Sequence, residues 1–233
     1  MMPARRFLAA ALLLSAPFAA SAGDEPSSPI SWEVNAVSDY LFRGVSQTDE
    51  KATLQGTLTW SSASGVYVGG FASGVDFGTG SPDIEVDYFV GYGFDASDSV
   101  NLDVMLNRYT YPGASELAYN ELITTATIAE HSAITVGYTN DIWGSGTDGW
   151  YYGLRHDWVL PREVTLSASV GRTQFRDNLA VAAEDYTDWS VAVSRRFGPA
   201  EVSLGYFGTD ASARASFGKL ADNRLLLSVK FAR

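Results

Sequence analysis

Charged side chains recur at alternate positions in several stretches of this sequence, interleaved with apolar ones. Between residues 83 and 94, for example, Glu85 and Asp87 alternate with Ile84 and Val86. In an extended strand this spacing places the carboxylates on one face and the apolar side chains on the other. If the charged face lines an enclosed passage, the carboxylates raise the local concentration of cations and repel anions.

Twelve charged residues share this alternation and are predicted to face a common interior. The acidic members outnumber the basic ones, which predicts a polar lumen that is acidic on balance and mildly selective for cations. The alternative is that these charges pair with one another and fill a narrow barrel. The set is Glu33, Asp39, Arg43, Glu85, Asp87, Asp103, Arg155, Asp157, Asp188, Glu201, Arg224 and Lys230.

Catalytic chemistry has little support in the sequence. The chain has two histidines, His131 in a predicted turn and His156 near the end of a predicted strand. Because a hydrolytic triad needs a nucleophile, a base and an orienting acid, His156 and Asp157 are the only participants we can name. No cysteine is present, which excludes thiolate chemistry and disulfides. We predict no catalytic residue, cofactor or metal site, and keep a barrel hydrolase as a minor alternative.

The N-terminus has the pattern of an export signal. Arg5 and Arg6 precede an apolar run over residues 7–14, and the small residues at 20–22 (ASA) form a cleavage motif. We predict a cleaved signal peptide over residues 1–22 and one mature domain over residues 23–233. The net charge of -11 argues against nucleic acid as a partner.

Alternation with a period of two continues along the mature chain and predicts about twelve strands. The first is predicted to run from Trp32 to Phe42, and the last covers the alternating residues 225–231. Four segments, beginning near residues 66, 119, 133 and 150, show a weaker pattern. Helical patterning is absent apart from a short turn at residues 178–184. A membrane-crossing strand needs about 9–11 tilted residues, which these segments can supply.

The predicted connections alternate between long and short along the chain. Residues 43–51 and 208–223 form long connections, whereas residues 161–163 and 198–199 form short ones. Membrane barrels have long external loops and short periplasmic turns in the same alternation. The pattern therefore predicts a closed antiparallel up-and-down transmembrane β-barrel, all-β, with both ends on the periplasmic side.

Composition indicates which face of the strands meets water. The chain is 18% charged and has three lysines, whereas soluble surfaces carry about 25–35% charged residues. Aromatic residues near the predicted strand ends, such as Trp32, Phe42, Trp60 and Phe231, are typical of interfacial girdles. Core aromatics of a soluble β-domain are the alternative. We predict that the apolar face contacts outer-membrane lipid of a Gram-negative bacterium, where barrel assembly machinery inserts the chain.

Two short motifs stand out, at residues 38–44 (SDYLFRG) and 109–113 (YTYPG). In both motifs the chain resembles the TorF-type porin family of proteobacteria, a conserved domain of unknown function. The resemblance extends over the whole mature chain. The resemblance implies an outer-membrane location and a pore, and it transfers no catalytic or ligand residue. We predict a porin-like channel for passive diffusion of small hydrophilic solutes, with a non-conducting structural or adhesive barrel as the alternative.

Overall fold

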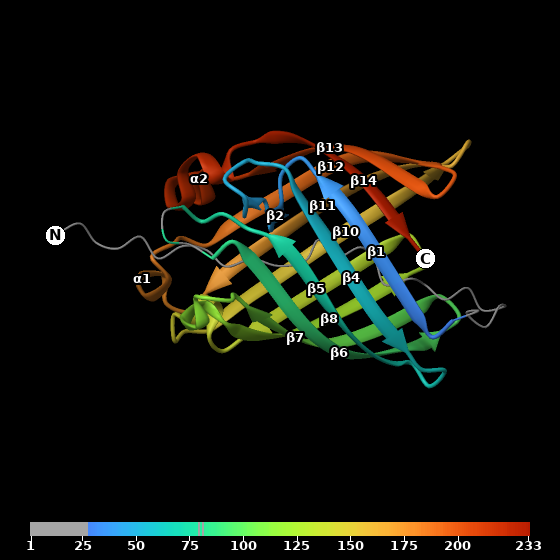
Figure 1. Ribbon diagram of the computed structural model, residues 1–233, viewed down its shortest axis with the longest axis horizontal. Helices are drawn as coiled ribbons and strands as arrows, with labels where there is room; N and C mark the ends of the chain where they lie inside the picture. Colours follow the sequence, from blue (N-terminus) through green and yellow to red (C-terminus); the bar gives the residue numbers. More distant parts are fainter. Residues whose placement is uncertain (1–27, 79, 81) are drawn as a thin grey trace.

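The computed structural model describes residues 28–78, 80 and 82–233. In this part of the chain, twelve strands form one closed antiparallel barrel in which neighbours in sequence are neighbours in the sheet (Figure 1). The first barrel strand pairs with the last and closes the wall. The predicted up-and-down barrel is confirmed. The predicted signal peptide lies outside the described residues, so the domain boundary at residue 23 stays a prediction.

The barrel strands vary in length from 8 to 14 residues, enough to cross a bilayer at a tilt. The four segments with weaker alternation are all strands. In chain order the barrel strands are β1 Ile30–Val37, β4 Thr53–Ser61, β5 Val66–Gly74, β6 Ile84–Ser97, β7 Val100–Thr110, β8 Tyr119–Ile128, β9 Ser132–Thr139, β10 Gly149–Leu160, β11 Val164–Phe175, β12 Tyr186–Phe197, β13 Ala200–Thr209 and β14 Arg224–Ala232.

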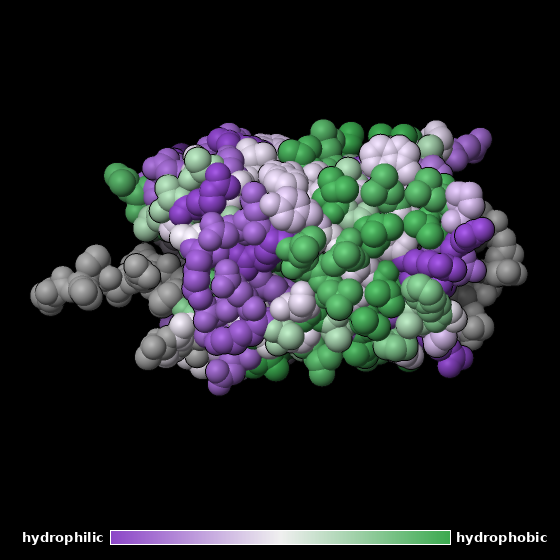
Figure 2. Space-filling view, turned by 90° about the horizontal axis from the view of Figure 1, so that it is seen from above, coloured by the Kyte–Doolittle hydropathy of each residue, from purple (hydrophilic) through white to green (hydrophobic). Residues whose placement is uncertain are grey.

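Side chains alternate between the inside and the outside of the wall, as the period of two predicts. In β6, Glu85 and Asp87 are fully buried, while Tyr88 and Val90 are exposed on the outer surface. Every barrel strand has exposed apolar side chains, and on the face seen in Figure 2 they form a broad band with hydrophilic surface toward either end. A continuous apolar band of this extent is not stable in water, so lipid must cover it.

The long connections gather at one end of the barrel and the short turns gather at the other. The helices α1 (Asn178–Val181) and α2 (Ala211–Phe217) lie at the long-loop end, on the left of Figure 1, and the C-terminus lies at the opposite end. Following the arrangement of membrane barrels, we name these the external and periplasmic ends. The odd-numbered connections are the long ones, as predicted.

The first strand ends earlier than predicted, because the chain leaves the barrel wall after Val37. Residues 38–52 turn back on themselves and form a small hairpin of β2 (Leu41–Phe42) and β3 (Val45–Ser46). Arg43 and Gly44 have positive φ angles, which a strand does not accommodate. Phe42 is buried, so its predicted place in an interfacial girdle was wrong.

The sequence analysis predicted one short helical turn and missed the second helix, α2. α2 follows Asp210, whose side chain accepts a hydrogen bond from the Ala213 backbone N–H and so caps the helix. The short helix α1 lies within the predicted turn at residues 178–184 and is capped in the same way by Asp177. Within the described ranges, no helix is long and apolar enough to cross a membrane.

Candidate functional site

Residues 38–52, named loop 1 here, fold into the external mouth of the barrel. Tyr40, Leu41 and Val45 are at most 3% exposed. They pack in one apolar cluster with inward side chains of the strands, such as Tyr109 and Tyr186, and with residues of the other external loops. In the structure, loop 1 therefore closes the external end with a packed apolar core, as in the interior of a soluble domain.

Arg43 anchors the tip of loop 1 to the barrel wall. Its Nη2 lies 2.6 Å from Oε1 of Glu121 on β8, and both side chains are at most 8% exposed. The guanidinium also lies over the rings of Phe42 and Tyr151, 4.4 and 4.2 Å from their centroids. Burial alone would lower the pKa of Arg43, but the Glu121 carboxylate raises it above its ordinary value. The arginine therefore stays charged and paired.

Further contacts hold the base of loop 1. Arg224 at the start of β14 binds Asp39 with a distance of 2.6 Å between Nη1 and Oδ2, and both are largely buried. The Tyr40 hydroxyl donates a 3.1 Å hydrogen bond to Oε1 of Glu85 on β6. Burial and the nearby Glu85 carboxylate raise the pKa of Tyr40 well above its ordinary value, so the hydroxyl remains a donor. Loop 1 is thus tied to several sides of the wall.

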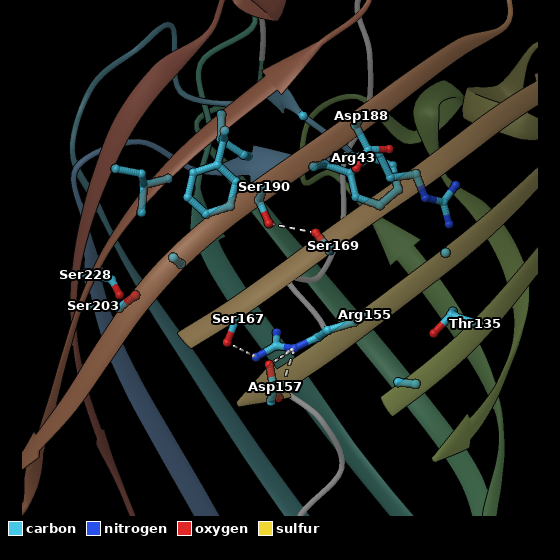
Figure 3. Close-up of a pocket in the computed structure, with 18 of the residues that line it drawn as sticks. Arg43, Thr135, Arg155, Asp157, Ser167, Ser169, Asp188, Ser190, Ser203 and Ser228 are labelled. Carbon is cyan, nitrogen blue, oxygen red and sulfur yellow. Dashed lines mark hydrogen bonds and ion pairs between the residues drawn. The ribbon is translucent and has the colours of Figure 1, made fainter. Parts of the chain in front are cut away.

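Beneath loop 1, a cavity of about 530 Å³ occupies the barrel interior. Residues 41–44 of loop 1 line its external end, and Glu33, Glu201 and Lys230 line it toward the periplasmic end. Much of its lining comes from small hydroxyl side chains on four adjacent strands, which we name the hydroxyl wall. The hydroxyl wall consists of Thr165, Ser167, Ser169, Ser190, Ser194, Ser203 and Ser228. Ser167, Ser169, Ser190, Ser203 and Ser228 are labelled in Figure 3.

Large apolar side chains fill the opposite half of the interior. Phe89, Met105 and Ile123 form a buried cluster on β6, β7 and β8, with Tyr67 of β5 packed against it. In the strand order these strands lie across the barrel from the hydroxyl wall on β11–β14. Phe89 is the residue that interrupts the polar alternation of β6. The bulky side chains therefore fill space on one side of the interior, whereas the small side chains of the hydroxyl wall leave space on the other.

Seven of the twelve charged residues predicted to face the interior line this cavity. They are Glu33, Arg43, Arg155, Asp157, Asp188, Glu201 and Lys230. Arg155 Nε lies 2.9 Å from Oδ1 of Asp157, as drawn in Figure 3, and Lys230 Nζ lies 3.0 Å from Oε1 of Glu201. The cavity charges are therefore extensively paired, as in the alternative considered for the sequence.

The other five predicted residues lie elsewhere. Asp39 belongs to loop 1 because the first strand ends before it, so its predicted placement on a strand was wrong. Arg43 lies in loop 1 as well, within the predicted connection at residues 43–51. Asp39 and Arg224 pair in the external mouth. The remaining three carboxylates lie on β6 and β7, and each accepts a side-chain hydrogen bond. The donors are Tyr40 for Glu85, Asn107 for Asp87 and Tyr67 for Asp103.

Two features of the site were missing from the sequence interpretation. Glu121, the partner of Arg43, lies in a segment whose alternation was weak, although Tyr119, Glu121 and Ile123 do share one face. The hydroxyl wall was visible as polar positions alternating with Val164 and Leu166, but only charged residues were weighed as functional. Small neutral side chains matter here because they leave the space that becomes the cavity.

The histidine considered for hydrolysis faces away from the cavity. His156 Nδ1 lies 2.8 Å from the Ser132 hydroxyl, and its ring packs on Trp158, which is exposed on the outer surface. Asp157 faces the lumen and binds Arg155. Pairing His156 with Asp157 was therefore wrong, because successive strand residues point to opposite faces. In the part of the chain that the structure describes, no group of three metal-binding side chains occurs.

Similar barrels occur among solved porins. The KdgM porin is 8% identical, with a TM-score of 0.56 over 86% of this chain and 98% of that one. A structure of the NanC porin is 9% identical, with a TM-score of 0.54 over 86% and 97% of the two chains. At these identities the likeness establishes a shared fold and nothing more.

Family membership rests on sequence. No curated protein matches the chain. Residues 21–231 match a family described as bacterial protein of unknown function, Gcw_chp. The match agrees with the predicted resemblance to a domain of unknown function, while the TorF-type name stays a prediction. Since the match spans almost the entire sequence, the chain belongs to the Gcw_chp family of bacterial proteins.

Proposed function

We propose that this protein is an outer-membrane channel through which small hydrophilic solutes diffuse passively when loop 1 moves aside. The observation that carries the proposal is a cavity lined in part by hydroxyl and charged side chains, inside a closed barrel whose outer surface is apolar. A lipid-facing band and a polar interior are the arrangement of bacterial porins. The fold shared with the KdgM and NanC porins, and the resemblance to TorF-type porins, support the same function.

The proposed location follows from the same features. Barrels of this kind reside in the outer membrane of Gram-negative bacteria, where barrel assembly machinery inserts them. The apolar band supports contact with outer-membrane lipid. The motif at residues 20–22 supports export by a signal peptide cleaved before Gly23.

The channel can be tested by filling the cavity from the hydroxyl wall. Ser203→Trp places a large ring in the cavity, whereas Leu204→Trp places the same ring on the lipid side, where Leu204 is exposed. We expect refolded S203W to show a lower single-channel conductance in planar bilayers than the native protein, and L204W to match the native protein. Equal conductance of S203W and L204W would contradict a route through this cavity.

We also propose a mild preference for cations. Among the cavity residues, Glu33, Asp157, Asp188 and Glu201 outnumber Arg43, Arg155 and Lys230. The preference is small because each of these bases contacts a carboxylate. Reversal potentials under a potassium chloride gradient measure it directly. A reversal potential of the sign that indicates chloride preference would overturn this part of the proposal.

The second candidate function is a structural or adhesive barrel that does not conduct. The apolar cluster between loop 1 and the strands favours it, because the packed side chains leave the cavity closed at its external end. The two functions differ in a single respect, which is whether loop 1 leaves the mouth under native conditions. Conductance of the native protein therefore separates them.

A further inference from the structure

The hydroxyl wall presents its side chains in rows across neighbouring strands. Thr165 pairs in register with Ser194, Ser194 with Ser203, and Ser203 with Ser228. Neighbouring strands lie about 4.8 Å apart, so this row offers hydroxyls at regular intervals. A second row contains Ser169 and Ser190, whose hydroxyls are 2.7 Å apart (Figure 3). Because each hydroxyl both donates and accepts hydrogen bonds, the rows are complementary to a solute rich in hydroxyls.

The charged groups around the cavity do not favour an anionic solute. Arg43, Arg155 and Lys230 each already contact a carboxylate, at 2.6, 2.9 and 3.0 Å. An anion would have to compete with those carboxylates and would also face Asp188 at the external end of the cavity. The bases are therefore neutralised before any solute enters.

Asp188 gives a second, independent indication of a ligand. The residue is 8% exposed and lines the cavity, and the Tyr151 hydroxyl is the side-chain hydrogen-bond partner of its carboxylate. Oδ2 lies over Gly171, 2.6 Å from where a Cβ of that residue would be, so the missing side chain leaves room for the carboxylate. Buried acceptors are normally satisfied. A carboxylate can accept several hydrogen bonds, so a hydroxyl of a bound solute can donate to Asp188 beside the Tyr151 hydroxyl.

From these observations we infer that the cavity is a binding site for uncharged polyhydroxylated solutes, such as monosaccharides, held by the hydroxyl wall and by Asp188. As a statement about transport the inference rests on the proposed function, but binding itself does not require conduction. Glu33, Glu201 and Lys230 at the periplasmic side of the cavity are about 26–30% exposed, so a solute can approach from there.

Three sugars that share one ring provide the test: galactose, its acid galacturonate and its amine galactosamine. Saturation-transfer NMR on the full-length protein in detergent compares their affinities. We expect galactose to bind, galacturonate to bind about fivefold more weakly, and galactosamine to bind through the same serines as galactose.

Variants of the hydroxyl wall locate the binding. S194A/S203A/S228A removes three hydroxyls without filling the cavity and is expected to weaken galactose binding about tenfold. S62A/S64A is the matched control, because these serines lie in an exposed periplasmic turn. If the triple variant does not fold, Ser203→Ala alone is expected to weaken binding in the same direction.

The outcomes separate this inference from the channel function. Selective galactose binding without any conductance would support the inference and overturn the channel. Failure of all three sugars to bind, or galacturonate binding as tight as galactose binding, would overturn the inference and leave the channel intact. The inference would also be overturned if galactosamine bound more tightly than galactose and the serine variants did not weaken its binding. The carboxylates, and not the hydroxyl wall, would then hold the solute.

Discussion

At the scale of single residues, the ion pair of Arg43 and Glu121 connects loop 1 to the wall. Both side chains are buried, and the Arg43 guanidinium lies over two aromatic rings. Breaking such a pair by removing one partner costs about 3–5 kcal/mol, because the other charge stays buried without compensation. The alternative for the chain is to expel the loop tip and expose Arg43 to water. The pair therefore couples the stability of the barrel to the position of loop 1.

Glu121→Gln is predicted to destabilise the closed mouth. We expect the free energy of unfolding to fall by about 3 kcal/mol, or by less if loop 1 is released, in which case the open time of the channel increases. Urea titration in micelles and single-channel recording measure the two effects. Asp157→Asn is the control, because its pair with Arg155 is exposed and is worth about 1 kcal/mol or less. An E121Q protein with native stability and native gating would contradict this anchoring role.

The charged positions on the strands could be predicted from the sequence, but their partners could not. A period of two fixes the face of the wall to which Glu33, Asp157 or Lys230 points, because it is a local property of a strand. The pair of Arg43 and Glu121 joins residues 78 positions apart. It exists only because loop 1 folds inward, and no local pattern encodes that insertion.

At the scale of elements, loop 1 departs most from the sequence prediction. Tyr40 and Phe42 continue the alternation of β1, and apolar side chains suit lipid and a packed core equally well. Periodicity alone therefore could not distinguish a strand extended to Phe42 from a hairpin folded into the mouth. In the structure the chain turns at Arg43-Gly44, where both residues adopt a positive φ, and this turn joins the two strands of the hairpin.

A disulfide can fix loop 1 in place, because the chain has no cysteine of its own. A Cβ on Gly44 would lie 2.6 Å from Cγ2 of Thr209, which is close to the geometry of a Gly44→Cys and Thr209→Cys bridge. We expect the oxidised double variant to conduct less than its reduced form, and the reductant to restore conduction.

The two single variants control for strain at Gly44, whose φ is 79°. They should conduct equally with and without reductant. If the double variant conducts equally in its oxidised and reduced states, solutes pass without movement of loop 1.

At the scale of the whole molecule, three features act together: the apolar outer band, the interior cavity and the closed external mouth. The band and the strand order followed from composition and loop lengths, which are properties of the entire sequence. The cavity exists because bulky residues on β6–β8 face small residues on β11–β14 across the barrel, and these strands are distant in sequence. The residue pattern within one strand does not show which side chains lie across the barrel from it.

The lipid-facing band predicts a strong asymmetry between neighbouring positions. Leu58→Arg puts a charge on the outer face, where Leu58 is 58% exposed, and is expected to destabilise the folded barrel by about 2–4 kcal/mol if it lies near the bilayer centre. Thr57→Arg, the adjacent substitution, enters the cavity and is expected to have a smaller effect. Folding titrations in lipid vesicles compare the two. Equal loss of stability would indicate that the outer band does not face lipid.

The central claim is that solutes pass through the barrel when loop 1 leaves the mouth. The most direct test is planar-bilayer recording of two proteins, the native one and a shortened form in which a short Gly-Ser linker replaces residues 39–49. We predict discrete conductance steps with closures for the native protein, and a larger conductance without closures for the shortened form. Silence of the native protein together with steps from the shortened form would show that loop 1 is a permanent plug. Silence of both folded forms would contradict the channel itself.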